Sequence, residues 1–424
     1  MHILIFTVGS SGDVFPFVAL GLELQRRGHT VTFMTGDHYE TAVRKTGLDF
    51  SALFTAQEFS DILEHPDVAH PIRNIRLVYR QLCLPWVSRV YDVIAKHNSP
   101  GETAVVASAF VFGARIAQEK LRVPTATVHL QPTFLRSIHD TPVYHGFPIR
   151  NLPSPLKSVL YRGMDWFLDG CVAKELNAFR GSLGLAPLNR FFANWINSPD
   201  CTLGLFPKWF APPQTDWPAQ VRLTGFPLFD GAEERPLPDQ LSQFLDAGEP
   251  PVVLTAGSQN NHGRWFFEAA VEACKQIGCR GLLVSAFPDQ VPENLPDGLL
   301  HVPFVPFNAV FRRGRVAVHH GGIGTMAPAF AAGIPQIAVP SFFDQPDNAA
   351  RLERLGAGLR VARKDFSGQS LADALGRVLR EPVFARKARE LSHDVDGPKA
   401  VAESCDVLEQ AFRRGRPPYA GATT

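Results

Sequence analysis

The sequence Val316-Ala317-Val318-His319-His320-Gly321-Gly322-Ile323-Gly324-Thr325 is the stretch that most strongly indicates the fold. Its apolar run predicts a buried strand, its glycines predict a tight turn, and residues 326–332 predict a helix. The start of such a helix presents free backbone N–H groups and the positive end of the helix dipole. The turn is therefore suited to a diphosphate, with His319 as an added donor. A plain turn with a packed histidine is the alternative.

Strand and helix patterns alternate on both sides of this stretch. We predict these elements at 3–6, 14–24, 31–34, 104–107, 111–121 and 125–130, and again at 251–254, 264–277, 281–285, 300–303, 315–318 and 336–339. Such alternation is typical of a doubly wound parallel sheet, which binds ligands at the carboxyl ends of its strands. Residues 133–192 interrupt the pattern with an insertion that looks helical at 159–168, and proline-rich residues 206–249 predict a linker.

The sequence therefore predicts an α/β protein with two Rossmann-like, doubly wound domains that face each other across a cleft. We place the first domain at residues 1–226 and the second at 227–424. A last helix, at about 400–412, follows the strands of the second domain and is free to pack back on the first.

Length and composition exclude several classes of protein. The 424 residues are enough for two domains, and 42 Lys and Arg balance 41 Asp and Glu. The net charge of +1 provides no field that would hold nucleic acid. The apolar runs are shorter than the roughly 18 residues of a membrane span, and no signal peptide is evident, so we expect a cytoplasmic protein. The 32 Phe against 6 Tyr and 6 Trp favour apolar walls suited to a lipophilic ligand.

The loop after the strand at 336–339 carries polar residues that suit a sugar. Asp344 and Gln345 are followed closely by Asp347 and Asn348. Adjacent carboxylate and amide groups can hold several hydroxyls of one sugar through charge-assisted and neutral hydrogen bonds. Asp344 or Asp347 can also cap the helix predicted at 348–355, and the two roles are compatible.

Residues 319–348, together with Phe304-Val305-Pro306-Phe307, resemble the donor-binding signature of the family 1 nucleotide-sugar glycosyltransferases, which have the two-domain GT-B fold. The resemblance implies that the first segment flanks the base, the glycine-rich turn binds the diphosphate and the acid–amide pair holds the sugar. The implied donor-binding residues are Ser258, Val305, Phe307, His319, Gly322, Gly324, Thr325, Asp344 and Gln345. Phe307 replaces the glutamine common in plant members, so the base contacts can differ. Ser258 also fits an ordinary turn.

The amino-terminal turn at residues 7–16 resembles the Gly-Ser-x-Gly-Asp-x-x-Pro turn of bacterial antibiotic and sterol glycosyltransferases. Plant relatives place a catalytic histidine close to the position of Asp13. A carboxylate held at a cleft can deprotonate an acceptor hydroxyl, so Asp13 is the candidate general base. The alternative is that Asp13 only caps the helix that follows.

Four stretches, 128–132, 204–214, 223–228 and 320–325, resemble a narrower group of the family, the rhamnosyltransferases of bacterial rhamnolipid synthesis. This resemblance implies transfer of L-rhamnose from dTDP-rhamnose to a hydroxyl of a lipophilic acceptor, such as a hydroxyalkanoyl-hydroxyalkanoate. The acceptor-binding residues we assign are Ser11, His129, Phe134, Tyr144 and Phe147. Ordinary core packing is the alternative for the aromatic ones.

The predicted function is therefore inverting glycosyl transfer, with a dTDP- or UDP-sugar as co-substrate and with no metal or other cofactor. Residues 394–396 imitate the Asp-x-Asp metal motif of the other large glycosyltransferase fold, but no apolar strand precedes them. The first alternative is a UDP-glucose-dependent glucosyltransferase that acts on a sterol, polyketide or flavonoid. The second is a sugar-nucleotide-binding subunit without catalysis. The partners we expect are the donor and the acceptor, with peripheral association with a membrane or a partner enzyme.

Overall fold

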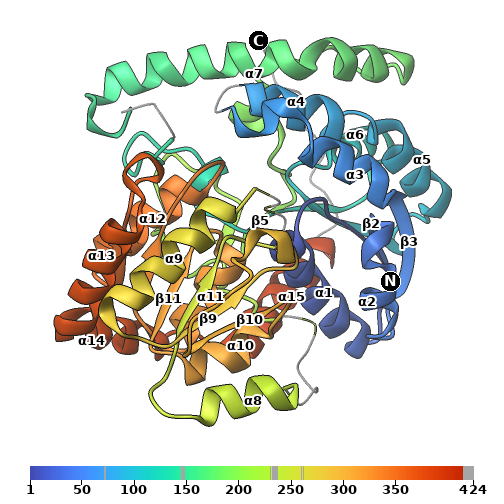
Figure 1. Ribbon diagram of the computed structural model, residues 1–424. Helices are drawn as coiled ribbons and strands as arrows, with labels where there is room; N and C mark the ends of the chain where they lie inside the picture. Colours follow the sequence, from blue (N-terminus) through green and yellow to red (C-terminus); the bar gives the residue numbers. More distant parts are fainter. Residues whose placement is uncertain are drawn as a thin grey trace.

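The computed structural model describes residues 1–70, 73–144, 149–229, 231, 237–258, 260 and 262–413. Its described strands form one sheet of seven strands and one of six, which lie in two halves of the molecule (Figure 1). All the strand pairs in both sheets are parallel. The predicted α/β class with two Rossmann-like domains is confirmed.

The first sheet has the order β3-β2-β1-β4-β5-β6-β7. Its strands are β1 (His2–Phe6), β2 (Thr30–Gly36), β3 (Asp49–Phe54), β4 (Thr103–Ser108), β5 (Thr125–His129), β6 (Cys201–Gly204) and β7 (Val221–Leu223). The second sheet has the order β10-β9-β8-β11-β12-β13. Its strands are β8 (Val252–Thr255), β9 (Gly281–Val284), β10 (Leu299–Val302), β11 (Val316–His319), β12 (Gln336–Ala338) and β13 (Gly358–Arg360).

The helices of the first half are α1 (Ser11–Arg26), α2 (Glu40–Arg44), α3 (Ala56–Leu63), α4 (Arg73–Leu77), α5 (Val87–His97), α6 (Phe112–Leu121) and α7 (Ser154–Ser182). Those of the second half are α8 (Asp239–Asp246), α9 (Arg264–Ile277), α10 (Phe307–Val310), α11 (Ile323–Ala331), α12 (Gln345–Leu355), α13 (Gly368–Arg380), α14 (Pro382–Ser392) and α15 (Gly397–Arg413).

Both faces of each sheet are covered, because alternate side chains of a strand point to opposite faces. In β1, Leu4 and Phe6 pack with residues of α5 and α6, while Ile3 and Ile5 pack with residues of α1 and α15. Strands buried on both faces read as continuous apolar runs. This is why the short runs in the sequence predicted the central strands.

The insertion contains a helix much longer than the predicted one at 159–168. Helix α7 has 29 residues and extends across one end of the molecule (Figure 1). Several of its apolar side chains are exposed, including Trp166 at 82%. Neither α7 nor any other helix in the described ranges has both the length and the apolar character needed to cross a membrane.

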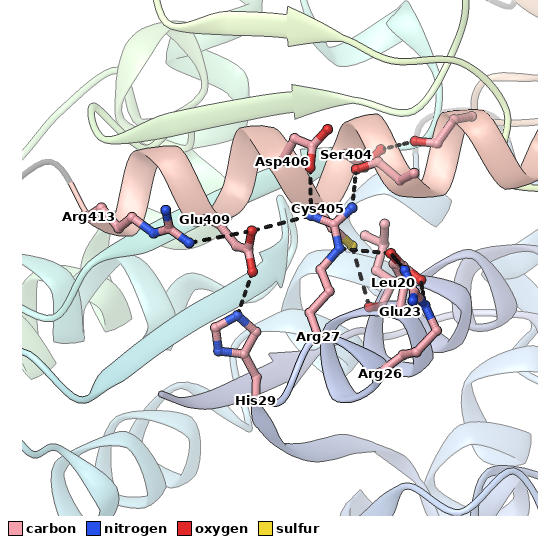
Figure 2. Close-up of polar contacts among 12 residues, drawn as sticks. Leu20, Glu23, Arg26, Arg27, His29, Ser404, Cys405, Asp406, Glu409 and Arg413 are labelled. Carbon is pink, nitrogen blue, oxygen red and sulfur yellow. Dashed lines mark hydrogen bonds and ion pairs between the residues drawn. The ribbon is translucent and has the colours of Figure 1, made fainter.

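The last helix, α15, leaves the second half and packs on α1 of the first half. Figure 2 shows Arg27, at the end of α1, reaching two acids of α15. Its Nη1 atom lies 2.6 Å from Asp406 Oδ1 and 3.2 Å from Glu409 Oε2. His29 Nε2 lies 2.8 Å from Glu409 Oε1. These contacts hold the last described helix against the first half. The two halves are therefore connected by the chain itself and again by these ion pairs.

Candidate active site

Three helices begin at the junction of the two halves. A Cβ atom built on Gly324, in the first turn of α11, would lie 2.7 Å from the Cα atom of Gly12, in the first turn of α1. A Cβ atom on Gly321 would lie 3.2 Å from the backbone oxygen of Gln345, the first residue of α12. Helix starts carry free N–H groups and a partial positive charge. Their meeting creates a place suited to negatively charged groups.

Asp13 lies at this junction, in the first turn of α1. Its Oδ2 atom accepts hydrogen bonds from Ser10 N at 2.8 Å and from Ser10 Oγ at 2.9 Å. Gly9 has a φ of 130°, and a Cβ atom there would overlap the Asp13 carboxylate. The helix cap itself is Ser10, and Asp13 completes a capping box with it. Burial raises the pKa of Asp13 above its ordinary value, although both hydrogen bonds from Ser10 oppose the rise.

Asp344 is the corresponding acid of the second half. It occupies the N-cap position of α12, but its carboxylate accepts no hydrogen bond from the helix backbone; instead, Asn348 Nδ2 donates to its Oδ2 at 2.5 Å and to Gly321 O at 3.0 Å. Burial, followed by the charge of Asp13, raises the pKa of Asp344 to about 7. Since the starts of α1 and α12 both lie against the start of α11, the structure places the two predicted acids, one from each domain, at the same junction.

The neighbours of Asp344 hold the loop before α12. Gln345 Oε1 accepts hydrogen bonds from Ser341 N at 2.9 Å and Phe342 N at 3.1 Å, so its amide oxygen organises this turn. Phe343 has a φ of 54°, a costly conformation for a bulky side chain. Its ring is 47% exposed beside the acid. The sequence did not single out Phe343, because no pattern marks a strained backbone at an aromatic residue.

The structure contradicts the role predicted for the side chain of His319. This residue is 0% exposed, its Nε2 lies 2.9 Å from Gln336 Oε1, and its Nδ1 accepts a hydrogen bond from Gly321 N at 3.0 Å. Both ring nitrogens are therefore occupied inside the fold, and burial lowers the pKa of His319 to about 4. The packed-histidine alternative is the correct one at this position.

His320 is the histidine that lies at the glycine-rich turn. Its ring occupies a slot between Gly257, where a Cβ atom would approach Cε1 to 3.0 Å, and Gly322. Among the described residues, nothing forms a hydrogen bond with its buried Nδ1 atom. Burial lowers the pKa of His320 to about 3, so the ring is neutral at pH 7 and can offer one N–H donor. The glycine-rich turn therefore presents His320, and not the predicted His319, beside Gly257 and Gly322.

The other predicted donor residues lie around this turn. Thr325 is buried in the first turn of α11, and its N–H donates to Gly322 O at 3.2 Å. Ser258 is exposed after β8. Of the residues predicted to flank the base, Val305 is buried in the core and Phe307 stacks on Phe311 with ring centroids 4.8 Å apart. A side-chain contact from Val305 is therefore excluded, whereas its neighbour Phe304, which is 59% exposed, presents a free aromatic face.

The predicted acceptor residues are only partly brought together. Ser11 Oγ lies 3.4 Å from Tyr39 OH, and Tyr144 OH donates to Thr133 O at 3.4 Å. Phe134 packs edge to face on Phe110, with ring centroids 4.9 Å apart. His129 is buried, with Nε2 2.8 Å from Asn197 Oδ1, so the structure contradicts an acceptor contact from this side chain. Phe147 lies outside the described residues.

A small apolar cavity of about 10 Å³ lies at the carboxyl edge of the first sheet. It is lined by residues that include Val8, which follows β1, and Phe110, which follows β4. Leu53, Trp86 and Phe112 also contribute to its walls, and no charged side chain does. A cavity of this size has room for about one water molecule, so it is a packing gap in the core of the first half and not an acceptor pocket.

Comparisons with known proteins agree with this geometry. Residues 3–139 match the glycosyltransferase family 28 N-terminal domain, and residues 283–408 match the erythromycin biosynthesis protein CIII-like C-terminal domain. The O-mycaminosyltylonolide 6-deoxyallosyltransferase of Streptomyces fradiae is 31% identical over 97% of this chain and 97% of its own length. A sterol 3-beta-glucosyltransferase of Pichia angusta is 27% identical over 97% of this chain and 34% of its own length.

Solved structures show the same fold. The glycotransferase of kitacinnamycin superposes with a TM-score of 0.75 at 20% identity, covering 97% of this chain and 99% of that chain. The spinosyn rhamnosyltransferase SpnG complexed with thymidine diphosphate superposes with a TM-score of 0.68 at 16% identity, covering 96% and 100%. With two domain matches, a relative similar along its whole length and this fold, the chain belongs to the family 1 GT-B nucleotide-sugar glycosyltransferases and is an enzyme of that class.

Proposed function

We propose that this glycosyltransferase moves a hexose, with L-rhamnose from dTDP-rhamnose as the first candidate, to a hydroxyl of a lipophilic acceptor with inversion. The observation that carries the proposal is the pairing of Asp13 and Asp344, one acid from each domain, where three helices begin. A general base and a sugar-binding acid are the two carboxylates that such a transfer needs. Both are close to N–H groups suited to a diphosphate.

In the proposed reaction, Asp13 takes the proton of the acceptor hydroxyl as its oxygen attacks the anomeric carbon. The bond between that carbon and the diphosphate oxygen breaks, and the diphosphate leaves toward the start of α11. A pKa above the ordinary value makes Asp13 a better base than an exposed aspartate. Holding both substrates between the domains supplies orientation, and the fixed N–H groups stabilise the charge of the leaving group.

We propose that the transfer needs no metal ion. The N–H groups of α11 and the neutral ring of His320 would interact with the diphosphate in place of a cation. Asp394 and Asp396 lie before α15, where Asp396 Oδ1 accepts a hydrogen bond from Lys399 N at 2.9 Å. That bond gives Asp396 a structural role at a helix start. It supports the interpretation that residues 394–396 are not a metal-binding motif.

The donor and the acceptor class are supported by different observations. The composition, with 32 Phe against 6 Tyr and 6 Trp, supports a lipophilic acceptor. The relatives act on a tylonolide and on a sterol, by their names, and one neighbour was solved with thymidine diphosphate. The likeness of four sequence stretches to rhamnolipid rhamnosyltransferases makes a hydroxyalkanoyl acceptor our first choice. A UDP-glucose-dependent reaction on a sterol, polyketide or flavonoid is the second.

A matrix of donors and acceptors tests the proposal. Purified protein is incubated with dTDP-rhamnose or UDP-glucose and with a hydroxyalkanoyl-hydroxyalkanoate, a macrolide aglycone or a sterol, and the products are identified by mass spectrometry. We expect a mass increase of one deoxyhexose on the lipid acceptor, and its formation should be at least about 100-fold slower with Asp13→Asn. Glucosylated sterol alone would establish the second choice and reject the first.

We also propose that the enzyme works in the cytoplasm, at the inner face of a membrane, where a lipophilic acceptor is available. Four side chains of α7, Leu156, Val159, Leu160 and Trp166, are at least 37% exposed and lie on one side of the helix by their spacing. Arg162, also exposed, adds a positive charge between them. Co-sedimentation with anionic vesicles tests this, and equal binding by Trp166→Ser would contradict it.

A further inference from the structure

A buried ion cluster joins the two domains within the first two turns of α12, next to Asp344. Arg351 of α12 is 2% exposed, and its Nε atom lies 2.8 Å from Asp347 Oδ2 on the same helix. Its Nη1 atom lies 2.7 Å from Asp140 Oδ2, which belongs to the first half of the chain, and donates to Phe210 O at 3.3 Å. A buried charge must be paired and hydrogen-bonded, so these contacts fix the place of Asp140 relative to α12.

Asp347 makes a second link to the same segment of the first domain. Its Oδ1 atom accepts a hydrogen bond from Val143 N at 3.0 Å. The second half of segment 137–144 is thus attached to α12, by the side chain of Asp140 and by the backbone of Val143. The next residue along the chain is Tyr144, which we predicted to line the acceptor site.

Contacts from the first domain define the other side of segment 137–144. Tyr161 OH and Lys157 Nζ, both on α7, donate to the backbone oxygens of Ser137 at 3.1 Å and Ile138 at 3.1 Å. These bonds hold the start of the segment, while α12 holds its end. The segment therefore lies between a helix of the insertion and a helix of the donor-binding domain.

Helix α12 serves two purposes in this arrangement. It begins at Gln345, directly after Asp344, and the residues that hold segment 137–144 follow within two turns. A helix is rigid over this distance, so the sugar-binding end and the anchoring residues keep a fixed separation. We propose that Arg351, Asp140 and Asp347 are positioning residues, which set the acceptor wall at 137–144 against the donor sugar held at the start of α12. This proposal rests on the proposed function for the identity of the two substrates.

The test uses Asp140→Asn, which removes one charge of the cluster and keeps the size of the side chain. Glu353→Gln is the matched control, because it makes the same chemical change on α12, where Glu353 pairs only loosely with Arg360 at 3.8 Å. Hydrogen exchange of the full-length protein reports on segment 137–144 without any substrate. Binding of thymidine diphosphate and uridine diphosphate, measured by calorimetry, reports on the donor site.

With Asp140→Asn we expect exchange in residues 137–144 to become at least tenfold faster, while nucleotide affinity stays within twofold. In transfer assays, kcat/KM for the acceptor falls 10- to 100-fold, and hydrolysis of the donor without acceptor stays within threefold. Asp140→Glu, which keeps the charge, restores part of the loss, and Glu353→Gln changes none of these quantities more than twofold.

Unchanged exchange at 137–144, or a parallel loss of nucleotide binding and acceptor use, would overturn the positioning role. Should Asp140→Asn fail to fold, Asp347→Asn replaces it, because that variant keeps an oxygen for Val143 N and weakens only the pairing with Arg351. The variant can show faster exchange and intact nucleotide binding while the wild-type protein glycosylates none of the acceptors tried. This result would support the positioning role of the ion cluster and count against the proposed function. The two failures are therefore distinguishable.

Discussion

Replacing Gly324 with alanine should separate the two domains by a small distance that can be worked out from the structure. The new Cβ atom would lie 2.7 Å from the Cα atom of Gly12, and ordinary contacts of this kind begin at about 3.4 Å. The opposing atom belongs to the backbone, so a side-chain rotation cannot relieve the overlap. The start of α11 has to move away from α1 by about 0.7 Å.

The expected effect on catalysis follows from this displacement. A misplacement of about 1 Å can cost on the order of 100-fold in rate, so we expect kcat to fall roughly 10- to 100-fold in Gly324→Ala. Stability should change little, because alanine is favoured over glycine in a helix by about 1 kcal/mol, which offsets part of the strain. Initial rates of nucleoside diphosphate release and the Tm are the measurements.

Gly12→Ala is the matched control, with the same chemical change on the facing helix. Its Cβ atom would lie 3.4 Å from the Cα atom of Gly324, which is an ordinary distance. We expect wild-type rates and an equal or slightly higher Tm. If Gly324→Ala also turned over at the wild-type rate, the contact between the two helix starts would have no part in aligning the substrates.

Four further predictions concern single side chains. Asp13→Asn should lower the transfer rate by about 100- to 10,000-fold with donor affinity within twofold, which separates a general base from a structural cap in kinetic and binding assays. His320→Ala should weaken binding of thymidine diphosphate about tenfold by calorimetry, whereas His319→Ala, which loses two internal hydrogen bonds, should lower the Tm. Arg27→Ala, which loses its ion pairs to α15, should lower the free energy of unfolding by about 1–2 kcal/mol and the Tm by a few degrees. An unchanged Tm would contradict a stabilising role for the ion pairs in Figure 2. The pKa of Asp344 is raised from 3.8 to about 7, so the folded protein holds this proton more tightly than the unfolded chain. The free energy of unfolding therefore falls as the pH rises from about 4 to about 7. Asp344→Asn removes this effect and should raise the Tm more at pH 8 than at pH 5.

The central strands could be predicted because burial on both faces leaves a continuous apolar run, as in residues 3–6 and 316–318. Short edge strands such as β13, with three residues, could not, because so few residues show no period. The length of α7 was also missed. Its buried residues Cys171, Val172 and Leu176 pack into the core of the first half, and its outer face also carries apolar side chains, so the helix lacks a clear contrast between polar and apolar sides.

The candidate site could be predicted as a set of segments but not as a set of side chains. Asp13 and Asp344 were found because acids at helix starts carry a local signal, and the structure places them together. His319 and His320 are adjacent in the sequence. Only the fold shows that the ring of His319 forms a hydrogen bond with Gln336 and is therefore not available to a ligand. Arg351 gave no signal either, because its partner Asp140 is far away in the sequence.

The two acids also connect the geometry of the domains to proton binding. Part of the rise in the pKa of Asp344 comes from the charge of Asp13, which belongs to the other domain. If the domains separated, this repulsion and part of the burial would be lost, and the pKa of Asp344 would fall. The arrangement described here would hold a proton more tightly than a separated one, and by linkage it would be favoured as the pH falls toward 7. Positive charges in place of Asp13 would lower the pKa of Asp344 and reverse this pH dependence. In the proposed reaction the diphosphate adds further negative charge near both acids, so its release should lower the pKa of Asp344.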